Sequence, residues 1–157
     1  MNDNEFMHRA IDLGRQNRGS PIGCVIVLNG AVVGEGHNEV DARHDPTAHA
    51  EIVAIRQACD ALKIQDLRGA TLYSTLQPCG MCSMASIWAG ISRIVYGAGR
   101  ADVHAMYFED RHLGTMDFIV DAYRHDLSVE GGVLGRECTS LYYRPDDNPP
   151  VEEQANL

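Results

Sequence analysis

Apolar residues along this chain form helical stripes and short continuous runs, and this pattern predicts alternating helices and strands. Helices are expected at residues 3–17, about 46–63, 79–89, near 102–107, near 115–123 and about 132–143. Strands are expected at residues 22–28, 31–37, 70–76, 92–96 and near 127–130. Asn29-Gly30 is a two-residue turn signal, so the first two strands are predicted to form an antiparallel hairpin.

A hairpin followed by strand, helix, strand, helix and strand predicts one mixed sheet of five strands. The sheet should begin antiparallel and continue mostly parallel, with right-handed crossovers that place helices on its faces. The chain is therefore expected to be an α/β domain over residues 1–144. Residues 145–157 contain four acids and several prolines but no Lys or Arg, which predicts a flexible acidic tail.

Composition narrows the range of partners. The chain has 157 residues and a formal net charge of −9, and its thirteen Lys and Arg residues are scattered, with no cluster of three. Nucleic-acid affinity rests largely on cationic side chains that displace counterions, so a nucleic-acid partner is disfavoured. The longest near-continuous apolar run, residues 22–28, is too short to span a bilayer, and no membrane partner is expected.

The cysteines and the N-terminus indicate a cytoplasmic protein. The first five residues are polar and acidic, and no apolar signal region follows them. The five cysteines do not form a disulfide framework of the kind that small secreted domains use. Cys24, Cys59 and Cys138 lie within apolar-patterned segments and are interpreted as small buried residues.

Two short motifs carry the candidate chemistry, namely His49-Ala50-Glu51 and Pro78-Cys79-Gly80-Met81-Cys82. One imidazole and two thiols make a ligand set suited to Zn²⁺, and three protein ligands leave the fourth tetrahedral position open, as in catalytic zinc sites. Both motifs are predicted to lie in the first turns of helices, where the helix dipole favours thiolate over thiol. Pro78 is expected at the first helical position.

Glu51 is not needed as a ligand, and its proximity to His49 suggests a catalytic role. It is expected to take a proton from a zinc-activated water, deliver it to a ring nitrogen of the substrate, and later protonate the departing amine. The N–H group of Ala50 is a candidate for orienting the substrate. Two readings without this catalytic role stay open, a purely structural zinc and a zinc-stabilised binding module.

The combination H-x-E followed by P-C-x-x-C is the signature of zinc deaminases. Over residues 3–110, and more weakly to 143, the chain resembles the cytidine-deaminase-like superfamily. Within it, the segment 44–51 resembles the small bacterial guanine deaminases, and the chain is also similar to cytosine and tRNA adenosine deaminases. The resemblance implies a three-layer α/β/α fold and a homodimer.

The resemblance also implies substrate contacts. Asn38 matches an asparagine that hydrogen-bonds the base, Trp88 matches an aromatic residue of the pocket wall, and Asp110 matches an acid that contacts the substrate. The alternatives are that Asn38 only caps the loop, that Trp88 is ordinary core, and that residues 109–111 are a solvated charge run. The chain departs from the guanine deaminases because residues 154–157 contain no aromatic residue to close the pocket.

The predicted function is hydrolytic deamination of a small free nucleobase, with guanine converted to xanthine and ammonia as the first choice. Cytosine, a pterin or another aminated heterocycle is the next possibility. A tRNA adenosine deaminase is a further alternative that fits the motif equally well but fits the acidic composition poorly.

Overall fold

The computed structural model describes residues 2–109 and 113–153. The helices in this part of the chain are α1 (Asp3–Gly14), α2 (Val40–Arg43), α3 (Ala50–Leu62), α4 (Gly80–Trp88), α5 (Thr115–Asp121) and α6 (Gly135–Thr139). The strands are β1 (Gly23–Leu28), β2 (Ala31–His37), β3 (Thr71–Leu76), β4 (Arg93–Ala98) and β5 (Ser128–Gly131). Three short 3₁₀ turns complete the described structure: η1 (Arg100–Asp102), η2 (Ala105–Tyr107) and η3 (Val151–Glu153).

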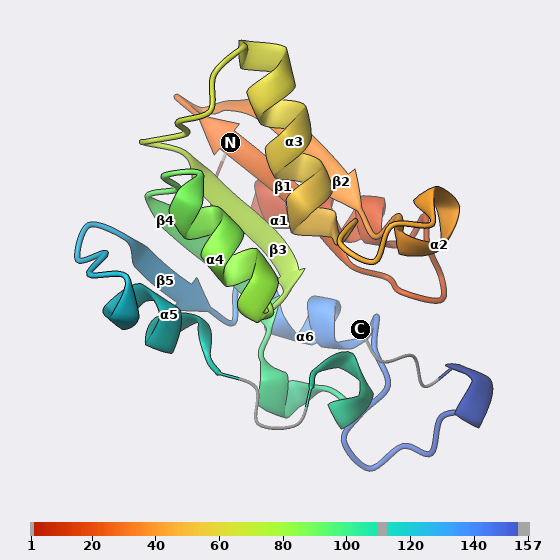
Figure 1. The fold of residues 1–157 in the computed structure, drawn as a ribbon. Helices are drawn as coiled ribbons and strands as arrows, with labels where there is room; N and C mark the ends of the chain where they lie inside the picture. The colour runs from red at the N-terminus through yellow and green to blue at the C-terminus, as the bar shows by residue number, and fades with distance from the viewer. Residues whose placement is uncertain (1, 110–112, 154–157) are drawn as a thin grey trace.

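The described strands form one mixed sheet in the order β2-β1-β3-β4-β5 (Figure 1). Strand β1 is antiparallel to both β2 and β3, whereas β3, β4 and β5 run parallel. The predicted mixed sheet of five strands is confirmed. The expectation that it would be mostly parallel is also confirmed, because β1 alone among the described strands runs against β2, β3, β4 and β5, which share one direction.

The helices cover both faces of the sheet, which confirms the three-layer α/β/α arrangement. Helix α1 packs against β1 and β3, and α6 packs against β4 and β3. Helix α3 packs against β2 and β1 on the opposite face, with α4 beside it and α5 beside α4 (Figure 1). Among the described residues, no helix is long and apolar enough to cross a membrane.

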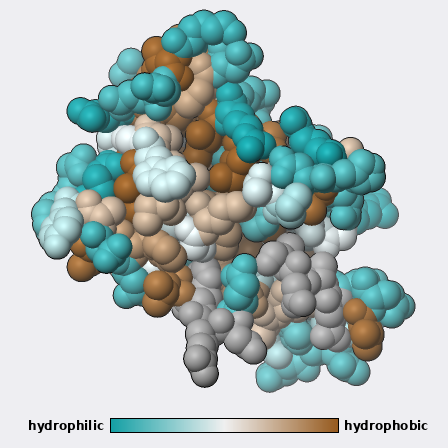
Figure 2. Space-filling model, viewed as in Figure 1, coloured by the Kyte–Doolittle hydropathy of each residue, from teal (hydrophilic) through white to brown (hydrophobic). Residues whose placement is uncertain are grey.

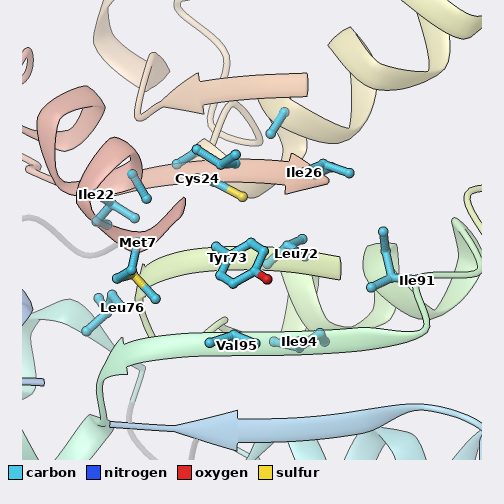
Figure 3. Close-up of a cluster of buried hydrophobic side chains, with 14 of the residues drawn as sticks. Met7, Ile22, Cys24, Ile26, Leu72, Tyr73, Leu76, Ile91, Ile94 and Val95 are labelled. Carbon is cyan, nitrogen blue, oxygen red and sulfur yellow. The ribbon is translucent and has the colours of Figure 1, made fainter. Parts of the chain in front are cut away.

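The core lies between the sheet and these helices. Ile26 on β1, Leu72 on β3 and Ile94 on β4 are completely buried, and their strands lie side by side in Figure 3. Met7 of α1 is also fully buried, but it packs on the opposite face of the sheet. Each such side chain contributes roughly 1.5–3 kcal/mol relative to an exposed position, so the core fixes the sheet that carries the functional residues.

Two glycines let α3 lie close to β2. Gly34 and Gly36 occupy alternate positions of β2 and face the helix. A Cβ atom on Gly36 would lie 2.6 Å from the carbonyl oxygen of Ala50, and one on Gly34 would lie 2.4 Å from that of Ala54. The close contact fixes the position of α3, and therefore of His49 at its start.

Local hydrogen bonding explains where the helix boundaries differ from expectation. Helix α3 begins at Ala50 instead of Pro46, because the Asp45 carboxylate accepts hydrogen bonds from the backbone N–H (2.8 Å) and the hydroxyl (2.6 Å) of Thr47. This arrangement holds residues 46–47 in a turn. The segment predicted as a loop contains helix α2, and the Asn38 Oδ1 atom accepts the N–H of Val40 at its start (3.1 Å).

The C-terminal segment makes contacts with the domain as far as it is described. Pro149 is buried, and the Tyr143 hydroxyl donates a hydrogen bond to Glu153 (2.6 Å). The flexibility of residues 145–157 stays a prediction.

Candidate active site

Three ligand-type residues meet where α3 and α4 begin. His49 is the N-cap residue of α3, Cys79 is the N-cap residue of α4, and Cys82 lies in the first turn of α4. His49 and Cys79 were expected inside the first turns, and Pro78 was expected at the first helical position. Pro78 instead precedes the cap, because Cys79 has an extended backbone (ψ 176°) and α4 begins at Gly80.

The spacing of these atoms suits a tetrahedral zinc ion. The Nδ1 atom of His49 lies 3.6 Å from Sγ of Cys79 and 3.6 Å from Sγ of Cys82, and the three ligand atoms lie within 4.8 Å of one another. Zn–N and Zn–S bonds of about 2.0 and 2.3 Å at a tetrahedral angle give an N···S distance of about 3.6 Å. The three side chains therefore fit Zn²⁺ without rearrangement and leave the fourth coordination position for water.

Electrostatics favour a thiolate in this cluster. The hydrogen bond from Cys82 and the one from His49 lower the pKa of Cys79 to about 4. The same pairing, together with burial, raises the pKa of Cys82 far above its usual value. Burial alone would lower the pKa of His49, but its hydrogen bond with Cys79 and the charge of Glu51 raise it. A divalent cation removes this competition for protons because it stabilises both thiolates.

Glu51 lies in the first turn of α3, and its side chain is 4% exposed. The hydroxyl of Ser74 on β3 donates a hydrogen bond to its Oε1 atom at 3.3 Å. Burial raises the pKa of Glu51, and the negative charge of Cys79 adds to this effect. A carboxyl group with a raised pKa can both accept and donate a proton near neutral pH.

A narrow cavity opens beside the cluster. The cavity-lining residues are Ile22, His49, Glu51, Leu76, Gln77, Cys79, Tyr107 and Phe108. The guanidinium of Arg100 lies 5.7 Å from the ring centroid of Phe108. Sequence reasoning missed most of these wall residues. Leu76 and Gln77 could have been found from their position just before Pro78, whereas Tyr107 reaches the site through an irregular loop.

The side chain of Asn38 caps the loop that follows β2, and its contact with the base stays a prediction. Its side chain is 3% exposed, and its Oδ1 atom accepts the N–H of Val40, which caps the loop. Its Nδ2 atom is buried and has no hydrogen-bond partner among the described residues. The backbone N–H of Asn38 donates to the carbonyl of the wall residue Ile22 at 3.1 Å. A buried amide that lacks a partner is a candidate ligand-binding group, because leaving it unpaired is unfavourable.

The other predicted substrate contacts have different outcomes. Trp88 is 81% exposed at the end of α4, so the predictions of a pocket wall and of a core residue are both wrong. It follows Cys82 by six residues, or about 9 Å of helix, which places it at the end of α4 away from the metal. Ala50 is fully buried as the first residue of α3, so its N–H has no intrahelical partner. Asp110 lies outside the described residues.

Residues 1–98 match the cytidine and deoxycytidylate deaminase zinc-binding region. The chain belongs to this family. It is a zinc-dependent enzyme that deaminates a nucleobase by hydrolysis, and His49, Cys79 and Cys82 form the group suited to the zinc.

Relatives of two kinds share this family. Guanine deaminase of Bacillus subtilis is 40% identical over 114 residues, which is 70% of this chain and 73% of the relative. The tRNA-specific adenosine deaminase of Buchnera aphidicola is 37% identical over 142 residues, which is 88% of this chain and 85% of the relative. The solved structure of guanine deaminase from Nitrosomonas europaea is 25% identical, with a TM-score of 0.77 over 88% of this chain and 81% of that chain.

Proposed function

We propose that this deaminase acts on a small free nucleobase, with guanine as first choice, and produces xanthine and ammonia. The observation that carries the proposal is the narrow cavity that buried Glu51 lines together with the zinc-binding His49 and Cys79 and with Phe108. The similarity to the guanine deaminase of Bacillus subtilis supports guanine. The net charge of −9 and the lack of a Lys/Arg cluster in the sequence support a small substrate over a polyanion.

In this mechanism, His49, Cys79 and Cys82 would hold the zinc, which would act as a Lewis acid and bring the pKa of a bound water close to neutrality. Glu51 takes one proton from the water and delivers it to the ring nitrogen next to the amino-bearing carbon. The water oxygen adds to that carbon, and Glu51 passes the second proton to the departing amine. Water and aminated base thereby become the keto base and ammonia.

The base would be oriented by groups around the cavity. The unpartnered Nδ2 of Asn38 is a donor for a ring nitrogen or carbonyl oxygen, and the N–H of Ala50 is a second donor at the start of α3. Asp110 is proposed to accept hydrogen bonds from the base and thereby to select it. Three different positions would then distinguish bases that share the reactive amidine.

A tRNA adenosine deaminase is the second candidate. It is favoured by the relative in Buchnera aphidicola, which aligns with 88% of this chain, and by further tRNA-specific relatives. The acidic composition opposes it, because binding a tRNA requires many phosphate contacts with Lys or Arg. Inosine formation in a tRNA anticodon loop, with no ammonia released from free bases, would establish this candidate instead.

The direct test is ammonia release by the zinc-loaded protein from a panel of guanine, cytosine, adenine, pterins, nucleosides and tRNA. The proposal expects guanine to give the highest kcat/KM. The matched control is the same protein after zinc removal, which should release no ammonia from any compound. If the protein releases ammonia from another base but none from guanine, the assignment to guanine is wrong and the deaminase mechanism stands.

Self-association is proposed to use an apolar face on α5 and the end of α4. Ile119 of α5 is buried, yet Met116 and Val120 on the same helix are 54% and 64% exposed. Figure 2 shows hydrophobic atoms on the surface where Figure 1 draws α5. Arg124, which follows α5, donates a hydrogen bond to the Ile87 carbonyl of α4 (2.9 Å), and the exposed Trp88 is the next residue of α4.

We propose that a second copy of the chain covers this face and forms the homodimer. Sedimentation should show a dimer for the wild type and a monomer for Val120→Glu. Val151→Glu is the control, because Val151 is 83% exposed in η3, far along the chain from this face. A dimer that persists in Val120→Glu would exclude this face as the interface.

A reducing cytoplasm is proposed as the location. The five cysteines, all among the described residues, are free thiols. Zinc binding needs two of them as thiolates, and an oxidising compartment would compete for these by forming a disulfide.

A further inference from the structure

A chain of buried hydrogen bonds connects the C-terminal segment to the sheet. The N–H of Gly23 donates to Oγ1 of Thr75 (3.1 Å), and Thr75 Oγ1 lies 2.6 Å from the hydroxyl oxygen of Tyr142. The Tyr142 hydroxyl donates to the Pro21 carbonyl (3.2 Å). Since a carbonyl only accepts, the Tyr142 hydroxyl uses its proton on Pro21, and the Thr75 hydroxyl must donate to Tyr142. The donor and the acceptor of each hydrogen bond in this series are therefore fixed. We call these four residues the tyrosine relay.

The tyrosine relay lies directly behind the wall of the cavity. Thr75 of β3 is followed in the sequence by Leu76, and Pro21, which precedes β1, is followed by Ile22. Both Leu76 and Ile22 line the cavity. The carbonyl of Ile22 accepts the N–H of Asn38 at 3.1 Å, so the relay is one residue away from the unpartnered amide. The ring of Tyr142 also packs edge-on against the wall residue Tyr107, with centroids 5.2 Å apart.

Among the described residues, no hydrogen bond joins the zinc-binding residues to the tyrosine relay. Thr75 and Tyr142 are 0% and 6% exposed, and Tyr142 lies beyond residues 1–98, which carry the family match. The two hydroxyls therefore hold the wall and Asn38 in place from the side away from the metal.

We propose that Tyr142 is a positioning residue that sets how tightly the base is held, acting through Pro21 and Ile22 on the cavity wall and on Asn38. Loss of its hydroxyl leaves the Pro21 carbonyl and the Thr75 hydroxyl unpaired in a buried place, and the first strand can then shift. Binding of the base weakens, whereas zinc and Glu51, which are carried by α3 and α4, keep their geometry.

Tyr142→Phe tests this directly, because it removes only the hydroxyl and keeps the ring against Tyr107. With the base that the ammonia panel identifies, KM should rise about five- to tenfold, in keeping with loss of the one buried hydrogen bond, to the Pro21 carbonyl, that acts on the wall, while kcat stays within about threefold. Zinc content should be unchanged. The matched control is Tyr143→Phe, since the Tyr143 hydroxyl contacts only Glu153 at the surface among the described residues and should leave KM unchanged.

A second measurement is independent of the substrate, and it separates failure of this proposal from failure of the proposed function. In Tyr142→Phe, hydrogen exchange should become faster at the amides of Gly23 and Asn38 and stay unchanged at that of Val95 in β4. Unchanged hydrogen exchange at both amides would overturn the proposal. So would a fall in kcat and in zinc content as large, in fold-change, as the rise in KM.

If Tyr142→Phe does not fold, Thr75→Val is judged by the same quantities, because it removes the hydrogen bond that Tyr142 accepts and the acceptor of the Gly23 N–H. Loss of folding in both variants would also overturn the proposal, because the pair would then support the whole domain and not the cavity wall.

Discussion

The Nδ1 atom of His49 lies 3.6 Å from the Sγ atom of Cys79, although thirty positions separate the two residues in the sequence. This is the separation that two ligands of one tetrahedral zinc ion require, about 3.6 Å. The sheet and the two helix starts hold the ligands at this separation, so the site is organised by the fold.

Cys79→Ser should therefore lose zinc. Even the outer partners of zinc ligands cost about 10- to 100-fold in affinity when they are removed, so loss of a direct ligand should weaken binding by at least about 100-fold. Metal analysis of the purified variant checks this expectation. Cys59→Ser, which changes a partly buried cysteine of α3 outside the zinc cluster, should retain about one zinc per chain. Equal zinc content in the two variants would contradict the assignment.

Ser74→Ala should slow catalysis without releasing zinc. The variant removes the hydrogen bond that Ser74 donates to Glu51 at 3.3 Å, so the carboxylate samples more orientations. We expect kcat to fall about three- to tenfold, the value of one hydrogen bond. Ser92→Ala is the control, because Ser92 accepts a hydrogen bond from the N–H of Gly69 and lines no part of the cavity. An unchanged kcat in Ser74→Ala would show that Ser74 does not orient Glu51.

Gly36→Ala should destabilise the fold and displace α3. The added Cβ atom would lie 2.6 Å from the Ala50 carbonyl, a backbone atom that cannot move alone. A loss of about 2–3 kcal/mol in the free energy of unfolding is expected for such overpacking, measured by urea denaturation. Gly19→Ala is the control, because its Cβ atom would meet only a side-chain oxygen at 3.6 Å and should change stability little. Similar stabilities for the two variants would contradict the close packing of β2 and α3.

Asp3→Asn should reduce stability in a pH-dependent way. Arg93 donates two hydrogen bonds to the Asp3 carboxylate (2.9 and 2.7 Å), which holds the pKa of Asp3 below 3.8, while burial opposes this shift. The ionised Asp3 carboxylate therefore stabilises the fold fully above pH 3.8, the usual pKa of the group. This stabilisation disappears as the pH falls through the lower pKa of Asp3 in the folded state. Because the pair is partly exposed, we expect a loss of about 0.5–1 kcal/mol at neutral pH.

Urea denaturation between pH 3 and 7 checks this expectation. The difference between wild type and Asp3→Asn should be constant above about pH 5 and should shrink below about pH 4. Asp12→Asn serves as the control, because the Asp12 side chain is 75% exposed in its pair with Arg15. If the difference in the free energy of unfolding between wild type and Asp3→Asn grew as the pH fell, the lowered pKa of Asp3 would be contradicted.

The sequence predicted the parts of this molecule that depend on local chemistry. The hairpin follows from Asn29 and Gly30, which both adopt the positive φ (52° and 77°) that the predicted turn needs. The zinc ligands follow from residue type and spacing, since few sites place an imidazole and two thiols at helix starts. Helix α3 was extended wrongly to Pro46, because the turn held by Asp45 was not recognised.

Most of the cavity wall could not be predicted, because it depends on contacts between distant segments. Tyr107 reaches the cavity from the loop after β4, and its packing against Tyr142 is set by the tertiary fold. Trp88 was assigned to the pocket wall from the family resemblance, whereas it lies exposed at the end of α4. Each of these positions is determined by how the layers pack, which no local pattern records.

The central claim is that Glu51 moves the protons while the three ligands hold the zinc. The most direct measurement is ammonia release and zinc content of Glu51→Gln, which keeps the size of the side chain and removes its acid–base chemistry. The account predicts a loss in kcat of about two to four decades with about one zinc retained per chain. A variant that retains zinc and stays within about threefold of the wild-type kcat would contradict it.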